Sequence, residues 1–421
     1  MSGDSETDEC REKSHGRVTV EDVEMARERI GDVVHRTPLD TSRTFAEMTG
    51  AASVGLKLEN VQRTGSFKIR GAYNKMAQLS PEEQSAGVIA SSAGNHAQGV
   101  ALAGDLLDID TTIVVPDVTP AAKIEATRGY GAEVVVEGDI YEQSYEYALE
   151  RAGETRRTFV HPFDDEAIVA GQGTIGLELL EQYPELDTVL VAIGGGGLIS
   201  GIGTVLEAVD REIRVIGVQP SGAAHAKPSL EAGEIRELPD VDTVAEGIAD
   251  TRLLETTFEI AREVVDDVVS VSDREIAAAV TLLAERAKTV AESAGAAPLA
   301  GALSLETDLE GNVGLVISGG NVNLIEHAEM TRTGLHELER YAEARLAIQG
   351  WPTTVGAVVE TVSAQGAEVD VLERARRTAV DHPNRTPVTI GLEGSGPVHL
   401  DGVLEALSEL DGVSIVERSL E

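Results

Sequence analysis

The sequence predicts a doubly wound α/β protein followed by a smaller α/β domain. Between residues 55 and 335, short apolar runs alternate with longer stretches of helical periodicity. Strands that are buried on both faces of a parallel sheet read as continuous apolar runs, and the connecting helices cover that sheet. After residue 344 the pattern changes to short alternating strands and two amphipathic helices. These observations define two regions with different architectures.

Local signals place the elements of the first region. Val20, Val23 and Ile30 share one helix face, and Gly31 ends that helix. Residues 332–344 are predicted to form a connecting helix. The predicted buried strands are Gly55–Leu58, Val88–Ser91, Thr112–Val115, Glu133–Val136, Thr188–Ile193, Val215–Gln219 and Val313–Ile317.

The second region, residues 344–421, has the pattern βαββαβ. Apolar residues alternate in its strands and recur at helical spacing in its helices. In order, the pattern predicts a strand at 346–348, a helix at 352–366, strands at 369–371 and 388–392, a helix at 400–410 and a strand at 413–416. This order of elements is that of a ferredoxin-like domain.

Composition and charge exclude several classes of function. The 421 residues include 73 Asp and Glu against 34 Lys and Arg, a formal net charge of −39. Nucleic acid and anionic membrane surfaces are not expected partners, because both attract basic proteins. No apolar run approaches the ~20 residues of a membrane span. Residues 1–16 are polar and are expected to be disordered. The single cysteine, Cys10, favours a reducing compartment, the cytoplasm.

The acidity also predicts an adaptation to salt. The acids are spread along the chain, and only seven residues are Lys. A charge of this size repels itself at low ionic strength, but at 1 M salt the screening length falls to about 3 Å. The composition therefore indicates a halophilic protein, with an ordinary acidic protein as the alternative.

The segment TGSFKIRG, residues 64–71, places a lysine between two apolar residues. A desolvated lysine has a lowered pKa and can act as a neutral nucleophile, as Schiff-base chemistry requires. Lys68 is therefore a candidate nucleophile. The alternative is a structural helix lysine whose amine reaches solvent.

The segment SSAGNHAQG, residues 91–99, directly follows a predicted strand. Its small residues allow a ligand to approach the backbone, and Asn95 offers both a donor and an acceptor. The alternative is a simple turn in which a serine caps the next helix.

Four consecutive glycines, Gly194 to Gly197, follow another predicted strand. Their backbone N–H groups at a helix N-terminus would form a phosphate-binding nest. A dinucleotide fingerprint does not fit, because position 200 is Ser and the next strand ends in Gln219 rather than an acid. The sequence also lacks a P-loop motif, so a phosphate is indicated but neither NAD nor ATP. A purely structural glycine turn is the alternative.

Together these segments resemble the fold-type II pyridoxal-phosphate enzymes, and closely the threonine dehydratases (threonine ammonia-lyases). The resemblance covers about residues 18–335. Its motifs are HRTPL at 35–39, LKLENVQRTGSFKIRGA at 56–72, SSAGNHAQGVA at 91–101, GGGGLISG at 194–201 and SGGN at 318–321. It implies a tryptophan synthase β-like fold of two open twisted sheets over residues 17–335. The implied large subdomain is 17–80 with 155–335, and the small one is 81–154.

The resemblance also implies residue roles. Lys68 matches the catalytic Schiff-base lysine, and Phe67 matches the residue beside the ring of pyridoxal 5′-phosphate. The further implied cofactor contacts are Asn95 to the ring 3′ oxygen, Gly194, Gly195, Gly196, Gly197 and Leu198 to the phosphate, Ser318 to the ring nitrogen, and Gly247. The implied substrate contacts are Ser66, Ser92, Ala93, Gly94 and Asn95.

The implied reaction is β-elimination of L-threonine to 2-oxobutanoate and ammonia, with L-serine giving pyruvate. Lys68 would remove the Cα proton. Ser318 is a neutral partner for the ring nitrogen, which suits prompt elimination. Isoleucine biosynthesis and threonine catabolism are both consistent with this reaction.

The sequence differs from serine racemases of the same family at two sites, and these differences narrow the choice of function. Serine racemases carry a serine where this chain has Ala93, so a lyase is favoured over a racemase. Their divalent metal is bound at positions that match Gln219, Ala223 and His225, which lack acidic ligands here, so no metal site is expected. A serine-preferring dehydratase and a non-catalytic amino-acid sensor remain alternatives, although Lys68 argues against the sensor.

The region 344–421 resembles an ACT regulatory domain. Such domains pair side by side and bind amino acids at the shared interface. The resemblance implies an amino-acid effector and a homo-oligomer, a dimer or a tetramer. The alternative is a module that serves only oligomerisation.

Overall fold

The computed structural model describes residues 18–209, 212–305, 309–378 and 382–419. The segment expected to be disordered, 1–16, lies outside these residues, as does Cys10. The chain separates into two compact units. The first comprises Met1–Val271 and Ala291–Asn321, and the second comprises Ser272–Val290 and Val322–Glu421.

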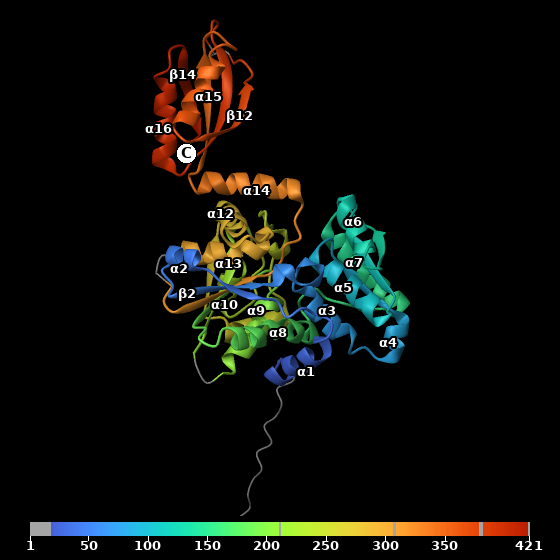
Figure 1. Ribbon diagram of the computed structural model, residues 1–421. Coiled ribbons are helices and arrows are strands. Elements are labelled where there is room, and N and C mark those ends of the chain that lie inside the picture. Colours follow the sequence, from blue (N-terminus) through green and yellow to red (C-terminus); the bar gives the residue numbers. More distant parts are fainter. Residues whose placement is uncertain (1–17, 210–211, 306–308, 379–381, 420–421) are drawn as a thin grey trace, which may run out of the picture. The chain divides into compact units, whose positions relative to one another are not determined.

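The first unit contains a six-stranded sheet (Figure 1). Its strand order is β1-β2-β10-β7-β8-β9, and only the β1–β2 pair is antiparallel. The strands, in this order, are Leu39–Thr41, Ser53–Leu58, Asn312–Ile317, Thr188–Ala192, Arg214–Pro220 and Asp267–Val271. Alternate residues of each strand point to opposite faces. Val189 and Val191 pack with helices α8 and α9, whereas Val218 faces Gly301 of helix α13.

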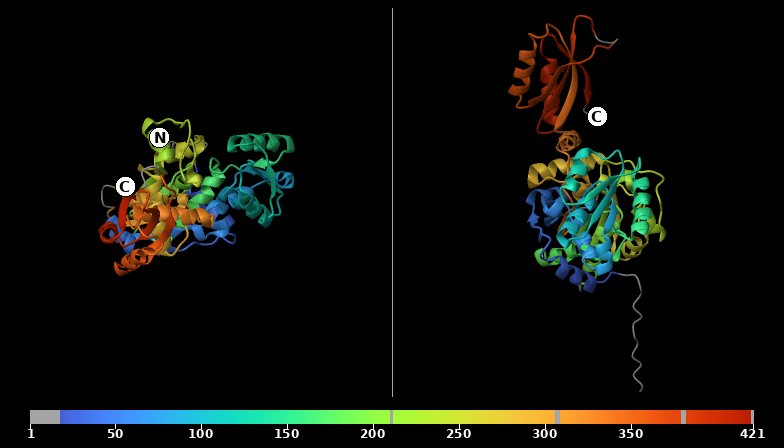
Figure 2. Two further views of the ribbon diagram at one scale, coloured as in Figure 1. Left: turned by 90° about the horizontal axis from the view of Figure 1, so that it is seen from above. Right: turned by 90° about the vertical axis from the view of Figure 1, so that its right-hand side faces the viewer.

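A second, fully parallel sheet has the order β5-β4-β3-β6. Its strands are Glu133–Val136, Thr111–Val115, Val88–Ser91 and Thr158–Phe159. Figure 2 shows this sheet with helices on either side. Val88 and Ile113 pack with helix α5, and Ile89 and Val114 pack with helix α7. The doubly wound class is confirmed for both sheets.

Twelve α-helices of the first unit connect and cover the two sheets in the described residues. They are α1 (Val20–Ile30), α2 (Arg43–Thr49), α3 (Lys68–Met76), α4 (Pro81–Ala86), α5 (Asn95–Leu107), α6 (Ala121–Arg128), α7 (Tyr141–Thr155), α8 (Glu166–Gln182), α9 (Gly197–Glu207), α10 (Ala226–Ala232), α11 (Glu255–Val264) and α13 (Ser293–Ser304). None of the helices in the described residues is both long enough and apolar enough to cross a bilayer.

The second unit contains the predicted βαββαβ domain. Strands β12, β13, β11 and β14 form an antiparallel sheet in that order, with Glu368–Arg374, Thr386–Glu393, Tyr341–Ile348 and Val413–Ser419. Helices α15 (Val355–Ala364) and α16 (Pro397–Ser408) bury Val358, Val362, Leu400, Val403, Leu404 and Leu407 in the same core as its strands. The ferredoxin-like prediction is confirmed. Helices α12 (Asp273–Leu282) and α14 (Leu324–Glu337) pack together in this unit.

The predicted connecting helix at 332–344 is wrong in its second half. Helix α14 ends at Glu337, and strand β11 begins at Tyr341. Glu339 has a φ of 53°, which breaks the helix. Ala342 and Ala344 then alternate into the sheet core. Alanines and charged residues suit a helix locally, but here pairing with two neighbouring strands decides the conformation.

A buried cluster of charges anchors helix α3 in the first unit. Arg70 is fully buried and donates to Glu59 at 2.7 and 2.8 Å and to Glu178 at 2.7 Å. Lys57 is also fully buried and donates to Glu178 at 2.5 Å. Each charge has an opposite partner, so removing one leaves an uncompensated charge in the interior.

Arg70→Ala should therefore lower the free energy of unfolding by about 3–5 kcal/mol. Arg43→Ala is the matched control, because Arg43 pairs with Glu47 on the surface and exposed pairs contribute little. Denaturant titration of both variants checks this expectation. A loss at Arg70 no larger than at Arg43 would contradict the role of the cluster.

Candidate active site

Lys68 begins helix α3 and its side chain is enclosed. Its Nζ donates to the carbonyl oxygen of Pro162 at 2.9 Å. Burial lowers the pKa of Lys68 from 10.5 to about 8, while the charges of Asp250 and Glu292 oppose that shift. The ring of Phe67 lies 5.2 Å from Nζ. The structure thus provides the partly neutral amine that a nucleophilic lysine requires.

The chain before Lys68 pairs with the loop after strand β10. Phe67 N donates to the Ser318 carbonyl oxygen at 3.2 Å, and Ser66 forms an isolated antiparallel bridge with Gly319. Ser66 is fully buried, and its hydroxyl has no hydrogen-bond partner within the described chain. A buried hydroxyl without a partner is costly, so this oxygen is suited to bind a ligand.

Asn95, at the start of helix α5, is held from two sides. Its Nδ2 donates to Glu292 Oε1 at 2.7 Å, and its Oδ1 accepts from Asn321 Nδ2 at 2.7 Å. Burial raises the pKa of Glu292 to about 7. This clamp orients the Asn95 amide and leaves one of its two N–H bonds free of the Glu292 contact.

The glycine loop joins strand β7 to helix α9. Gly196 has a φ of 88°, and this N-cap glycine has no side chain that could bond the first amides of α9, so those N–H groups can face an anion, while the Gly195 amide donates to Asp250. A Cβ on Gly195 would lie 2.3 Å from the Phe163 ring. Pro162, the neighbour of Phe163, accepts the Lys68 hydrogen bond. The glycine loop and Lys68 therefore both contact the segment Pro162–Phe163.

The remaining predicted residues fall in the same region. A Cβ on Gly247 would lie 3.1 Å from Ala294 and 3.9 Å from Glu292 Oε1. The Ser92 hydroxyl accepts from Gly94 N at 3.2 Å, and the space beside Gly94 is open. Ala93 is half-buried on the same turn, and Leu198 is buried in the first turn of α9.

Three polar side chains of this region were not predicted from the sequence. Asp250 and Glu292 carry buried carboxyl groups, and Asn321 bridges Asn95 and the Thr64 carbonyl oxygen at 2.6 Å. Asn321 lies inside the quoted SGGN motif, which was the available signal. The other two stand in segments whose local pattern is unremarkable, so only their position in space identifies them.

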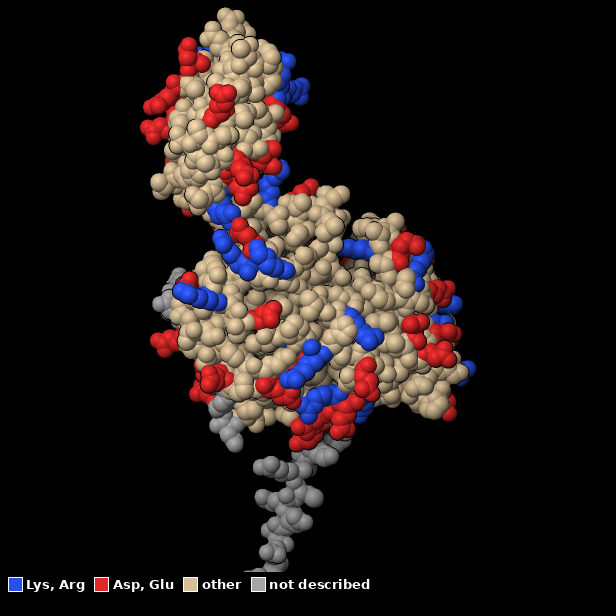
Figure 3. All heavy atoms as spheres, viewed as in Figure 1, with Lys and Arg blue, Asp and Glu red and all other residues tan. Residues whose placement is uncertain are grey.

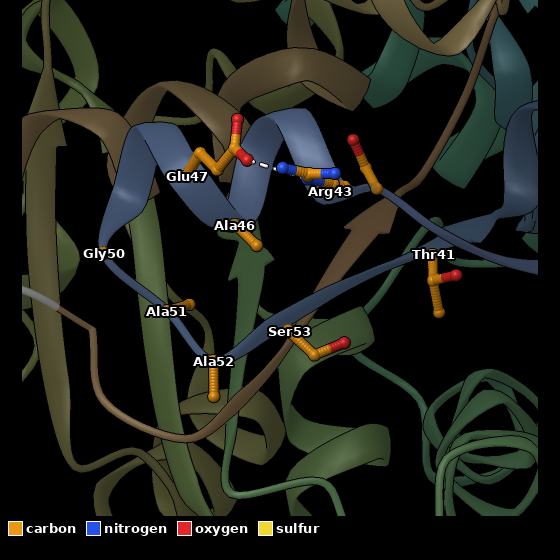
Figure 4. A pocket seen from close by; sticks show the side chains of 9 residues that line it. Thr41, Arg43, Ala46, Glu47, Gly50, Ala51, Ala52 and Ser53 are labelled. Carbon is orange, nitrogen blue, oxygen red and sulfur yellow. Dashed lines mark hydrogen bonds and ion pairs between the residues drawn. The ribbon is translucent and has the colours of Figure 1, made fainter.

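Two other places in the structure can be compared with this site, a hollow at the surface and the residues Gln219 and His225. The hollow in Figure 4 lies between helix α2 and strand β2, where Arg43 and Glu47 pair at 2.8 Å. At two of the positions considered for a metal in the sequence analysis, Gln219 Nε2 and His225 Nε2 lie 3.1 Å apart. The described residues contain no group of three or more His, Cys, Asp or Glu that could hold a metal ion.

Residues 30–319 match the family of pyridoxal-phosphate dependent enzymes. The chain therefore belongs to this family. It is 43% identical over 353 residues to an L-threonine ammonia-lyase of Thermotoga maritima, covering 84% of this chain and 88% of the relative. A second L-threonine ammonia-lyase, of Geobacter sulfurreducens, is 41% identical over 93% of this chain and 96% of its own length.

Solved structures show the same likeness. Maize serine racemase has a TM-score of 0.71 and 37% identity, covering 74% of this chain and 96% of its own. The processed form of threonine deaminase isoform 2 from Solanum lycopersicum also has a TM-score of 0.71, with 35% identity over 76% and 95% of the two chains. Both confirm the predicted fold class of the catalytic region.

The donor groups of the site fit pyridoxal 5′-phosphate. The uncapped N-terminus of α9 suits the phosphate, the amine of Lys68 suits the aldehyde, and the unpartnered Ser66 hydroxyl suits a polar ligand atom. When bound, this cofactor supplies an electron sink for the carbanion that proton removal creates.

The lowered pKa of Lys68 predicts how the apoprotein takes up the cofactor. Only the neutral amine attacks an aldehyde, so the uptake rate should rise with pH through about 8 and then level off. Stopped-flow absorbance across a pH series measures this rate, and Lys68→Ala, which should show no such phase, is the control. A rate that keeps rising toward 10.5, the ordinary lysine value, would contradict the burial of the amine.

Proposed function

We propose that this protein is an L-threonine ammonia-lyase, which converts L-threonine to 2-oxobutanoate and ammonia and L-serine to pyruvate. The observation that carries the proposal is the buried amine of Lys68 beside an uncapped glycine loop. The relatives named L-threonine ammonia-lyase, which align over most of the chain, support the substrate.

In this proposal each residue has one task. Gly194 to Gly197 and the Leu198 amide hold the phosphate, Ser318 faces the ring nitrogen, and Asn95 donates to the ring 3′ oxygen. Phe67 packs beside the ring, and Gly247 leaves room for it. Ser66 and the turn Ser92, Ala93, Gly94 and Asn95 bind the substrate carboxylate. Lys68 Nζ then removes the Cα proton.

A racemase is the second candidate, because the maize serine racemase shares the fold and 37% of the aligned residues. Racemisation needs a group that delivers a proton to the opposite face of Cα. Ala93 carries no such group, so elimination is favoured. A non-catalytic sensor would not need the buried Lys68 amine.

Purified enzyme should release ammonia from L-threonine faster than from L-serine, and Lys68→Ala should abolish both reactions. The physical reason is that Lys68 Nζ is assigned both the bond to the cofactor and the removal of the Cα proton. Coupled assays of 2-oxobutanoate and pyruvate, with chiral analysis of the remaining amino acid, measure elimination and racemisation together. Predominant formation of the D-enantiomer would contradict the lyase, and serine preference would revise the substrate.

We further propose that residues 17–335 are the catalytic domain and that residues 344–421 are an ACT-like regulatory domain that binds an amino-acid effector and pairs the subunits into a dimer or tetramer. The ferredoxin-like order of β12-β13-β11-β14 supports this role. The Geobacter sulfurreducens relative aligns over 93% of this chain, so the alignment extends into the tail.

Isoleucine should shift the threonine saturation curve of the full-length enzyme, and a chain that ends at Glu339, before β11, should lose that shift. An effector acts only through unequal affinity for two enzyme states, and its contacts lie in its own site. Steady-state kinetics with and without isoleucine measure the shift, which would also favour a biosynthetic over a catabolic role. A shift that survives in the shortened chain would place the effector site in the catalytic domain.

We also propose that the protein works in the cytoplasm at high salt. Figure 3 shows acidic and basic side chains scattered over the visible face, while the sequence carries a net charge of −39. Because screening removes self-repulsion, the melting temperature should rise from low salt to about 1 M KCl. Differential scanning fluorimetry across KCl, with sucrose at equal osmolality as the control, tests this. An unchanged melting temperature would contradict halophilic adaptation.

A further inference from the structure

Asp250 is a half-buried carboxyl group for which the roles above give no task. It follows the short helical turn Glu246–Ile248 and reaches the glycine loop. A Cβ placed on Gly194 would lie 2.6 Å from Asp250 Oδ2. Asp250 therefore lies against the loop to which the phosphate is assigned.

The groups that face Asp250 come from several elements. Lys68 approaches from helix α3, and its charge favours the carboxylate, as does the amide of Gly195. Tyr141 approaches from helix α7, and the charge of Asp250, after burial, raises the pKa of Tyr141. His225 lies beside Gly194, where burial lowers its pKa to about 4 and keeps it neutral. Glu292 acts on Lys68 from the other side.

Burial outweighs these contacts and raises the pKa of Asp250. A phosphate in the adjoining loop adds a second anion at close range, and two neighbouring anionic groups do not both stay ionised. The phosphate has several backbone N–H donors in the loop, whereas Asp250 has the Gly195 amide. A phosphate in the adjoining loop therefore raises the pKa of Asp250 further and favours its protonated form.

We propose that Asp250 donates the proton with which the β-hydroxyl of the substrate leaves as water. The proposal rests on the β-elimination proposed above. Its basis is the position of Asp250 against the phosphate loop, where a Cβ on Gly194 would lie 2.6 Å from Asp250 Oδ2, together with the electrostatic interaction between this carboxyl group and the Lys68 amine. Asp250 is thereby the general acid and Lys68 the general base of one reaction.

The step balances without a further reactant. Lys68 Nζ takes the Cα proton, and the electron pair of that C–H bond forms the double bond between Cα and Cβ. The Cβ–O bond breaks, its electron pair leaves with oxygen, and the Asp250 proton converts the departing hydroxide into water. The Lys68 ammonium then returns its proton to the Asp250 carboxylate, which resets both groups.

Two substrates separate this role from a structural one. A hydroxyl needs a proton in order to leave, whereas the chloride of β-chloro-L-alanine does not. Asp250→Asn should therefore lower kcat for L-threonine by about 10²-fold and leave kcat for β-chloro-L-alanine close to wild type. Asp240→Asn removes one exposed carboxylate from the preceding segment and is the matched control.

Ligand binding gives a readout that does not depend on turnover. Pyridoxine 5′-phosphate carries the phosphate but lacks the aldehyde, so Lys68 does not react with it. Its affinity for the wild-type apoprotein should fall as the pH rises and Asp250 ionises. In Asp250→Asn the fall in affinity that comes from ionisation of Asp250 should vanish. At high pH this variant should therefore bind pyridoxine 5′-phosphate more tightly than the wild type does. Equilibrium dialysis across a pH series measures both.

Three outcomes would overturn the proposal. Equal losses with both substrates would make Asp250 a positioning residue, and an unchanged rate with L-threonine would remove it from the reaction. A pH dependence of binding identical in wild type and Asp250→Asn would show that no proton is shared with the phosphate. By contrast, wild-type enzyme that releases no ammonia from L-threonine or L-serine would defeat the proposed function itself, which the binding experiment does not require.

Discussion

The enclosure of one amine governs this site. Lys68 loses solvent because Pro162, Phe67 and the backbone of α5 surround it, and a Cβ on Gly99 would lie only 3.0 Å from the Lys68 carbonyl carbon. Burial disfavours the ammonium form, so the amine is partly neutral near neutral pH. The buried pairing of Arg70 with Glu59 and Glu178, two residues further along α3, holds the helix that presents this amine.

Two carboxyl groups interact with the Lys68 amine, and burial changes the pKa of all three groups. Asp250 and Glu292 both attract a proton to Lys68, and burial raises the pKa of each. Burial outweighs both charges, so the pKa of Lys68 stays lowered beside them. The raised pKa of each carboxyl group means that it binds a proton more readily than a free carboxyl group, and Glu292 also orients Asn95. The same desolvated environment therefore determines the pKa of the proposed acid Asp250, of the proposed base Lys68 and of Glu292, which orients Asn95.

The glycine loop shows how packing and function impose the same residues. Gly196 needs a positive φ, and Gly195 and Gly197 lie against Phe163, so a side chain at these positions meets steric resistance even without a ligand. The open N–H groups of helix α9 are a second reason for the same glycines. The sequence alone left both readings open, and the family match over residues 30–319 favours the functional one.

The sequence by itself determined the positions of seven strands, the βαββαβ tail and the segments that form the site, because apolar periodicity and glycine runs are local signals. The expected burial of the strand Glu133–Val136 is wrong, because β5 lies at the edge of its sheet and both of its end residues are exposed. The sequence did not reveal β1, β6 and β9, whose short or half-polar runs become strands through sheet pairing, nor the end of α14 before β11. Asp250 and Glu292 also needed the tertiary structure. Glu292 lies 197 residues from Asn95, which donates to it, and Asp250 lies far along the chain from Lys68. The burial that gives a carboxyl group its chemistry is a property of three-dimensional packing.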